Sequence, residues 1–320
     1  TVLVIILVSV VSLTENKSKN IDTLRIAHPL DPSHPLHRAL EHFAKRTEEF
    51  SQGSMRVLIY PNGQLGSDRE CLEQLQYGIL SMGITSCGPL EGFVPDMQIF
   101  GIPYVFRSRE HMINVLDGPI GSHILASGEK YGLKGLCFYD AGARSFYTKD
   151  KPVYTPADLA GLKIRVMKTT MSIKTMKALG ALPTPIDFGE LYTALQQGVV
   201  DGAENNPPSF MTSMHYEICR YYSMDEHLRI PDILLVSTLF WEKLSPQQQR
   251  IVQQAAVESA YFQRAIWQEF TQTSLEKVQS AGVEVISPQK ELFIEAVRPL
   301  WQSFEGTSVG TMIQKIQDVQ

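Results

Sequence analysis

Residues 24–60, LRIAHPLDPSHPLHRALEHFAKRTEEFSQGSMRVLIY, contain one helix pattern between two strand patterns. The opening LRIAH and the closing MRVLIY, Met55–Tyr60, are short apolar runs of the kind found in strands. Between them, Pro35–Phe50 places apolar residues three or four positions apart, which predicts an amphipathic helix. Strand, helix and strand in this order indicate an α/β protein.

A second helix and a third strand extend the alternation. Ser67 and Glu70 have the spacing of a capping box, in which each side chain satisfies the other's backbone amide at a helix start. Gly78 supplies a helix stop, and the apolar run Met82–Thr85 follows it. The first part of the chain therefore has the order β-α-β-α-β.

The same order returns after residue 160. Its expected elements are strand Leu162–Met167, helix Met171–Leu179, strand Pro183–Ile186, helix Gly189–Gln197 and strand Val199–Ala203. The second helices of the two parts end in similar letters, LQYG at residues 75–78 and LQQG at residues 195–198. A matched order of elements is better explained by two parallel α/β halves than by chance.

Two α/β halves can face each other across a cleft. Ligands of open parallel sheets collect at the carboxyl ends of the strands, so functional residues are expected just after the strands. We assign residues 21–142 with 230–266 to a first α/β domain and residues 143–229 with 267–320 to a second.

The chain crosses between the assigned halves near Ala141–Ala143 and Leu228–Ile233, where we expect a hinge. A long amphipathic helix that begins at Ser245 and continues through Leu275 should pack along both halves.

Composition limits the partners. Hydrophobic residues make up 43% of the 320 positions, so the chain can bury a large core. The formal net charge is -5, and the 29 lysines and arginines are spread along the chain without a long basic run. Nucleic acid is therefore not expected as a partner.

The first residues have a composition of their own. Val2–Leu13, VLVIILVSVVSL, is about as long as the apolar core of a signal peptide. It is shorter than the roughly 20 apolar residues that a spanning helix needs. We interpret residues 1–20 as the remnant of an export signal or a tail, with a membrane anchor as the alternative.

Metal and cofactor signatures are missing from the sequence. His28, His34 and His37 lie close together, but no HExxH pattern or standard acidic ligand spacing accompanies them. Neither GxGxxG nor GxxxxGK[ST] occurs. The cysteines occur singly and are interpreted as small core residues: Cys71, Cys87, Cys137 and Cys219. We expect no metal and no cofactor.

One pattern resembles a catalytic motif. Gly306–Gly310, GTSVG, fits the nucleophile elbow GxSxG. An elbow follows a strand, whereas Glu291–Phe304 has a helical pattern, and no histidine occurs after His227. The sequence therefore predicts a binding protein and no enzyme.

Two arginines are placed to bind an anion. Arg165 alternates with apolar residues near the carboxyl end of its predicted strand, and Arg144 follows Gly142 after another apolar run. The guanidinium fork matches a carboxylate, although alternation alone also fits a solvated strand face.

Polar residues follow the third strand of each half. Asn205 and Asn206 lie in a turn before two prolines, and their amides can both donate and accept. Ser86 lies at the corresponding point of the first half, among small residues that would let a ligand approach the backbone. Ordinary turn chemistry is the alternative for these residues.

From about Leu24 onward the chain resembles the solute-binding subunits of tripartite ATP-independent periplasmic (TRAP) transporters, the DctP-type family. The resemblance lies in YPNGQLG at residues 60–66, IPY at 102–104, DLAGLKIRV at 158–166, PTP at 183–185 and VDGAEN at 200–205. It implies a periplasmic-binding-protein-like clamp: α/β, with two domains, a cleft between two mixed sheets and long connecting helices. It also implies that Arg165 holds a ligand carboxylate and that the domains close on binding.

Within this resemblance, Arg144, Phe188 and Asn205 match pocket positions of sialic-acid-binding members, whereas Ser86 replaces an acidic residue of those members. The doubled asparagines and the histidine-rich first loop are similar to the branch that takes hexuronates. The candidate ligand-binding residues are Arg165, Arg144, Asn205, Asn206, Ser86, Phe188, Glu70 and His34.

The resemblance implies a monomeric periplasmic receptor that works with membrane permease subunits. A C4 dicarboxylate or sialic acid is the alternative ligand. An α/β enzyme acting on a sugar acid and a sensory or scaffold protein are the alternative classes.

Overall fold

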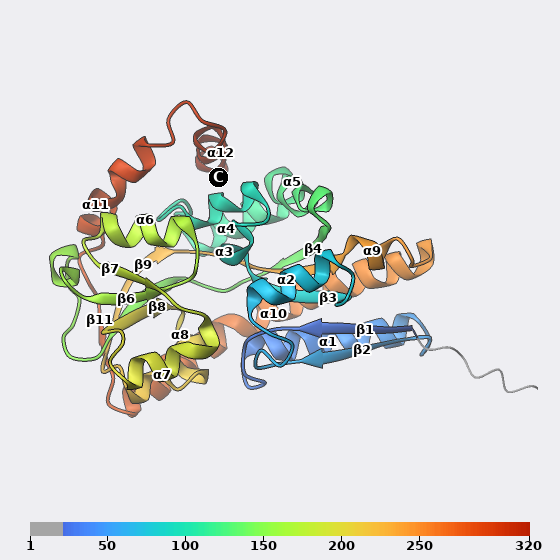
Figure 1. The fold of residues 1–320 in the computed structure, drawn as a ribbon, viewed down its shortest axis with the longest axis horizontal. Helices are drawn as coiled ribbons and strands as arrows, with labels where there is room; N and C mark the ends of the chain where they lie inside the picture. The colour runs from blue at the N-terminus through green and yellow to red at the C-terminus, as the bar shows by residue number, and fades with distance from the viewer. Residues whose placement is uncertain (1–21) are drawn as a thin grey trace, which may run out of the picture.

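The computed structural model describes residues 22–320, which form two mixed sheets (Figure 1). The first sheet has the order β2-β1-β3-β10-β4, with bounds β1 Asp22–Ala27, β2 Met55–Tyr60, β3 Met82–Ser86, β4 Leu133–Tyr139 and β10 Asp232–Ser237. The second has the order β11-β9-β5-β8-β6-β7, with bounds β5 Arg144–Thr148, β6 Lys163–Val166, β7 Leu182–Pro185, β8 Gly202–Asn205, β9 Tyr221–Leu228 and β11 Glu284–Ile286. The expected fold class is confirmed.

Helices cover both sheets. The helices of the first half are α1 Pro35–Phe50, α2 Asp68–Gln76, α3 Cys87–Leu90, η1 Pro95–Gly101, α4 Arg109–Asp117, α5 Pro119–Ser127 and η2 Glu129–Tyr131. Those that follow are η3 Pro156–Leu159, α6 Thr170–Ala178, η4 Phe188–Glu190, α7 Leu191–Gln196, α8 Pro207–Thr212, η5 His215–Glu217, α9 Thr238–Trp241, α10 Pro246–Ser280, α11 Lys290–Gln302 and α12 Ser308–Gln317. No helix within residues 22–320 is both long and apolar enough to cross a membrane.

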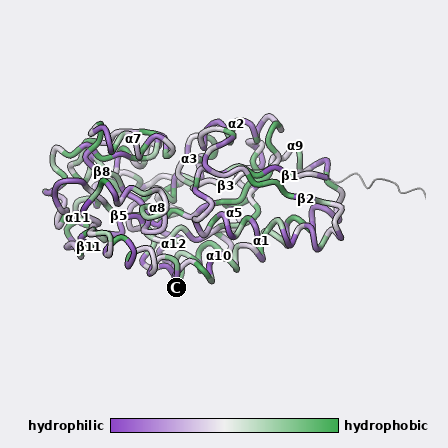
Figure 2. The backbone as a smooth tube through the Cα atoms, turned by 90° about the horizontal axis from the view of Figure 1, so that it is seen from below, coloured by the Kyte–Doolittle hydropathy of each residue, from purple (hydrophilic) through white to green (hydrophobic). Residues whose placement is uncertain are grey.

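Periodicity predicted α1 and β2 with their bounds. The apolar face of α1, which includes Leu36, Leu40 and Phe43, is buried against the first sheet and α10. Figure 2 shows this pattern as alternating green and purple along the α1 tube. Burying each such side chain stabilises the fold by roughly 1.5–3 kcal/mol.

The expected strand at Val199 begins later. The helix α7 ends at Gln196, and Gly198 turns the chain with a φ of 72°. The Val199 amide then bonds back to Ala194, and the Val199 side chain is exposed. Because this turn uses the apolar residues that suggested a strand, β8 starts at Gly202.

The chain passes between the sheets twice through short segments. Residues 140–143 join β4 to β5, and residues 229–231 join β9 to β10. The 35-residue helix α10 also spans both halves, because it packs on α1 and β4 and then on α8 and β11 (Figure 1).

The last helix, α12, lies against η1 and near α4 of the first half. His111 of α4 bonds to the carbonyl of Ile316 at its end. The domain division given above remains a proposal.

Candidate ligand-binding site

The cleft between the halves is lined from both sheets. Three neighbouring strands, β5, β8 and β6, present Arg144, Asn205 and Arg165 from the second half. The first half contributes Ser86 at the end of β3 and Asp232 at the start of β10. Other lining residues are Pro29, Leu30, Leu36, Asp68, Ile84, Thr85, Ala141, Met167, Phe188, Asn206 and Ser209.

Arg165 is a buried cation with spare donors. Its side chain is 2% exposed, its Nε donates to the Ile186 carbonyl at 2.8 Å, and its guanidinium lies 5.7 Å from the centre of the Phe188 ring. Within residues 22–320 no carboxylate lies within ion-pairing distance of it. Burial lowers the pKa of Arg165 because it penalises the charged form. A ligand anion would relieve this cost.

Arg144 is bound within the protein. Its Nε lies 2.5 Å from Glu204 Oε2, and its Nη2 donates to Glu204 Oε1 at 3.0 Å. Its Nη1 donates to Asn205 Oδ1 at 2.9 Å. Burial opposes the charge on both partners, but Arg144 still holds the pKa of Glu204 at about 2. The two arginines therefore differ, and Arg165 is the one with unused donors.

A buried histidine, His227, lies next to the Arg144–Glu204 pair. His227 Nδ1 lies 2.7 Å from Asp225 Oδ2, and its Nε2 lies 3.7 Å from Glu204 Oε2. Burial disfavours the imidazolium, but Asp225 and Glu204 together raise the pKa of His227 to about 9. The charged imidazole helps to fix Glu204, which in turn fixes Arg144.

The asparagines have capping and bridging roles as well as places in the cleft. Asn206 caps α8, since its Oδ1 accepts from Ser209 N at 2.8 Å, and its Nδ2 donates to the Ala141 carbonyl at 3.0 Å. Asn205 Oδ1 accepts from Arg144, while its Nδ2 has no hydrogen-bond partner among the described residues. Ser86 Oγ accepts from Gly88 N at 3.5 Å.

Two candidates lie outside the cleft lining. Glu70 is exposed, forms the predicted capping box with Ser67 and lines a surface hollow that adjoins the cleft. His34 is buried and caps α1, and its Nε2 lies 3.3 Å from Ser209 Oγ. Burial lowers the pKa of His34 to about 3, so it is neutral. Phe188, by contrast, lies in the cleft lining beside Arg165.

The structure adds two carboxyl groups that sequence reasoning missed. Asp68 is half-buried at the first turn of α2, where its Oδ1 accepts from Thr85 Oγ1 at 2.8 Å, and burial raises its pKa. Asp232 is 8% exposed. A polar residue immediately before the apolar run ILLVS at 233–237 was the available signal.

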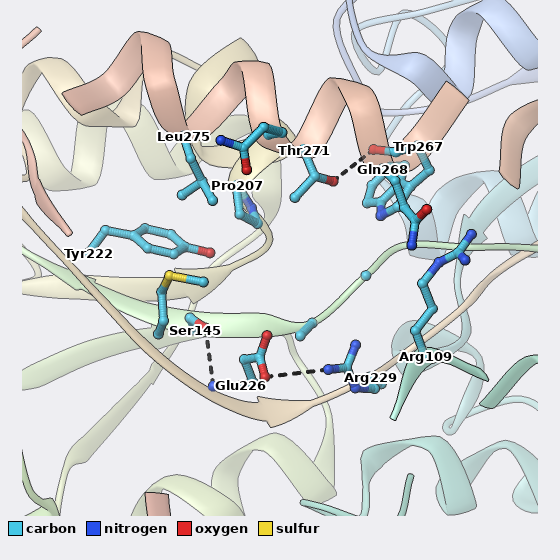
Figure 3. A pocket seen from close by; sticks show the side chains of 14 residues that line it. Arg109, Ser145, Pro207, Tyr222, Glu226, Arg229, Trp267, Gln268, Thr271 and Leu275 are labelled. Atoms are coloured by element: carbon cyan, nitrogen blue, oxygen red, sulfur yellow. Dashed lines mark hydrogen bonds and ion pairs between the residues drawn. The ribbon is translucent and has the colours of Figure 1, made fainter. Parts of the chain in front are cut away.

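A second hollow lies next to the two chain crossings, which contribute Gly142, Ala143 and Arg229 to its lining. It is bounded by Trp267, Thr271 and Leu275 of α10 on one side and by Tyr222 and Glu226 of β9 on the other (Figure 3). Its volume of about 240 Å³ exceeds the 60 Å³ of the cleft. This hollow is a poorer site for an anionic ligand than the cleft, because its arginines are already paired within the protein. Arg229 pairs with Glu226, and Arg109 pairs with Asp140.

The two motifs considered in the sequence have no catalytic or metal-binding setting. Gly306–Gly310 forms the start of α12, where Thr307 Oγ1 accepts from Gly310 N at 3.1 Å. Among residues 22–320 no group of three histidine, cysteine or acidic side chains could hold a metal ion. The four cysteines, all in the described part, are free thiols.

Two α/β halves, short crossings and a charged cleft define a solute-binding clamp. The chain belongs to the DctP family of bacterial extracellular solute-binding proteins, family 7, whose model matches residues 26–307. Members are solute-binding proteins and not enzymes, so the family prediction is confirmed.

Similar proteins support this assignment. A TRAP periplasmic solute-binding protein from a Bradyrhizobium species, solved with galacturonate, is 42% identical, with a TM-score of 0.90 over 92% of this chain and 99% of that one. One from Chromohalobacter salexigens, solved with D-glucuronate, is 36% identical, with a TM-score of 0.90 over 93% and 100% of the two chains. A solute-binding protein of the same organism is 37% identical over 92% of this chain and 88% of its own length.

Proposed function

We propose that this protein captures a hexuronate, D-glucuronate or D-galacturonate, in the periplasm and delivers it as a monomer to the permease subunits of a TRAP transporter. The observation that carries the proposal is Arg165, a buried guanidinium that lines the cleft and has no carboxylate at ion-pairing distance within residues 22–320. Two similar proteins of known structure hold these acids.

The chemistry of the cleft fits a sugar acid. The free donors of Arg165 can take the ligand carboxylate as a bidentate pair, which is stronger in a dry cleft than in water. The adjacent Phe188 ring offers an apolar face to a sugar ring. The Asn205 amide nitrogen and the Ser86 hydroxyl can bond to ring hydroxyls. A C4 dicarboxylate would leave several of these groups unpaired.

Capture requires the cleft to open and close. The two short crossings, residues 140–143 and 229–231, are the segments about which the halves could rotate as rigid bodies. Ligand should therefore reduce the radius of gyration in small-angle scattering. Identical scattering with and without saturating ligand would refute closure.

The proposal is tested by calorimetric titration with glucuronate, galacturonate, sialic acid and succinate. We expect both hexuronates to bind more tightly than the other two acids. The Arg165→Ala variant should lose roughly 30-fold to several thousand-fold in affinity, the effect of removing a buried charge-assisted contact. Arg165→Lys should also bind weakly because lysine lacks the fork.

Arg250→Ala, a change at an exposed arginine of α10, is the matched control and should bind as the wild type does. Tightest binding of succinate would overturn the sugar-acid assignment. Wild-type affinity in Arg165→Ala would overturn the carboxylate clamp.

A further inference from the structure

Asp232 is a buried carboxyl group without a partner. Its side chain is 8% exposed and lines the cleft, and it makes no hydrogen bond or ion pair with the rest of residues 22–320. Carboxyl groups on mostly buried residues are usually paired within the protein, and the Asp232 carboxyl instead faces the cleft without a protein partner. An unpaired carboxyl facing a ligand cleft therefore indicates a partner supplied by the ligand.

The backbone fixes the position of this carboxyl group. Asp232 is the first residue of β10, an interior strand between β3 and β4, and it pairs with Ser86 on one side and Tyr139 on the other. It cannot move far without breaking the sheet. A purely structural role would require a hydrogen bond or an ion pair of the carboxyl group, and neither is present within residues 22–320.

The positive and negative groups of the cleft lie on opposite sides, which are formed by the two halves of the chain. The second half supplies the cations Arg144 and Arg165, and the first half supplies the carboxyl groups of Asp68 and Asp232. A ligand between the walls needs an anion at one end and hydroxyl donors at the other. A second carboxylate at the Asp232 end would meet two acidic groups.

The surroundings of Asp232 raise the pKa of its carboxyl group, which can accept a hydrogen bond in either protonation state. Burial and the nearby Asp68 raise the pKa of Asp232 to about 7, Arg144 opposes this rise, and Asp140 adds to it. The buried Cys87 thiol also lies within its field. Arg144 does not neutralise Asp232 because its fork is occupied by Glu204.

We propose that Asp232, supported by Asp68, is a specificity-determining residue that accepts a hydrogen bond from a ligand hydroxyl and excludes dicarboxylates from the cleft. This inference rests on the proposed function, since it assumes that Arg165 holds the carboxylate end. Asp232 would then bind the hydroxyl end of the ligand, opposite the carboxylate end at Arg165. This arrangement would favour hydroxylated acids with one carboxylate over dicarboxylates.

The test compares Asp232→Ala and Asp232→Asn with the wild type in titrations with glucuronate, galacturonate and succinate. We expect Asp232→Ala to bind the preferred hexuronate roughly 10- to 100-fold more weakly, the loss typical of one hydrogen bond to a charged group. The same variant should bind succinate at least as well as the wild type does. The ratio of the hexuronate affinity to the succinate affinity therefore falls. Asp232→Asn keeps one acceptor oxygen and should show the same trend with a smaller loss.

Thermal denaturation without ligand separates this role from a structural one. Removing an unpaired buried carboxyl group should leave the melting temperature of Asp232→Asn equal to or above that of the wild type at pH 8. Asp150→Asn, at an exposed turn position, is the matched control. Equal losses for hexuronate and succinate, or a lower melting temperature, would overturn the inference while the proposed function stands. Wild-type protein that binds neither hexuronate would overturn both.

Discussion

Replacing Glu204 by glutamine should destabilise the protein strongly. Glutamine has the size of glutamate but no charge, so Arg144 and His227 would stay buried without their shared anion. Arg144 is 6% exposed and Glu204 1%, so solvent cannot compensate. Breaking a buried pair by removing one partner costs about 3–5 kcal/mol. A large part of the usual stability of a domain, roughly 5–15 kcal/mol, would be lost.

Urea denaturation, followed by circular dichroism at pH 7, measures this loss as a lower midpoint with an unchanged slope. Asp150→Asn removes an exposed charge and should behave as the wild type does. A loss in Glu204→Gln of less than about 1 kcal/mol, the value typical of exposed pairs, would refute the account of Arg144 as a cation that Glu204 holds in place.

Three further predictions concern the hinge, pH and the cap. Gly142→Ala should lower the melting temperature more than Gly161→Ala does. Both glycines have a positive φ, but only at Gly142 would the new Cβ lie 2.9 Å from Trp267 Nε1. Equal decreases in the melting temperature would refute a close contact between the crossing and Trp267. Between about pH 4 and 7 Asp232 keeps its proton in the folded state and releases it in the unfolded state, so its contribution to the free energy of unfolding should fall as pH rises. Subtracting the urea-derived profile of Asp232→Asn from that of the wild type isolates this slope, and two parallel profiles would contradict the raised pKa. Glu70→Ala should lower the urea midpoint slightly and leave hexuronate affinity unchanged in calorimetry, since the Glu70 side chain accepts from the Ser67 backbone amide in the capping box of α2. Weaker hexuronate binding would show that Glu70 contacts the ligand.

Local patterns predicted much of the fold. The bounds of α1 and β2 follow from periodicity over a few residues, and the capping box at Ser67 depends on neighbours three positions apart. Val199 was placed in a strand because an apolar residue in a turn and one in a strand look alike in sequence. The structure alone separates them, through the turn at Gly198.

The site was predicted less completely because its contacts join distant residues. Arg165 could be found from its place at the end of a strand, but the engagement of Arg144 by Glu204 joins positions 60 residues apart. Asp232 was missed for a different reason. Ligand-binding residues are expected after parallel strands, whereas β10 is antiparallel to β3 and brings its first residue to the end of β3.

The most direct test of the account is a crystal structure of the complex with glucuronate or galacturonate. We expect the ligand carboxylate to form a bidentate pair with the guanidinium of Arg165 and a ring hydroxyl to donate to Asp232. A carboxylate bound elsewhere, with Arg165 unpaired in the occupied cleft, would contradict it.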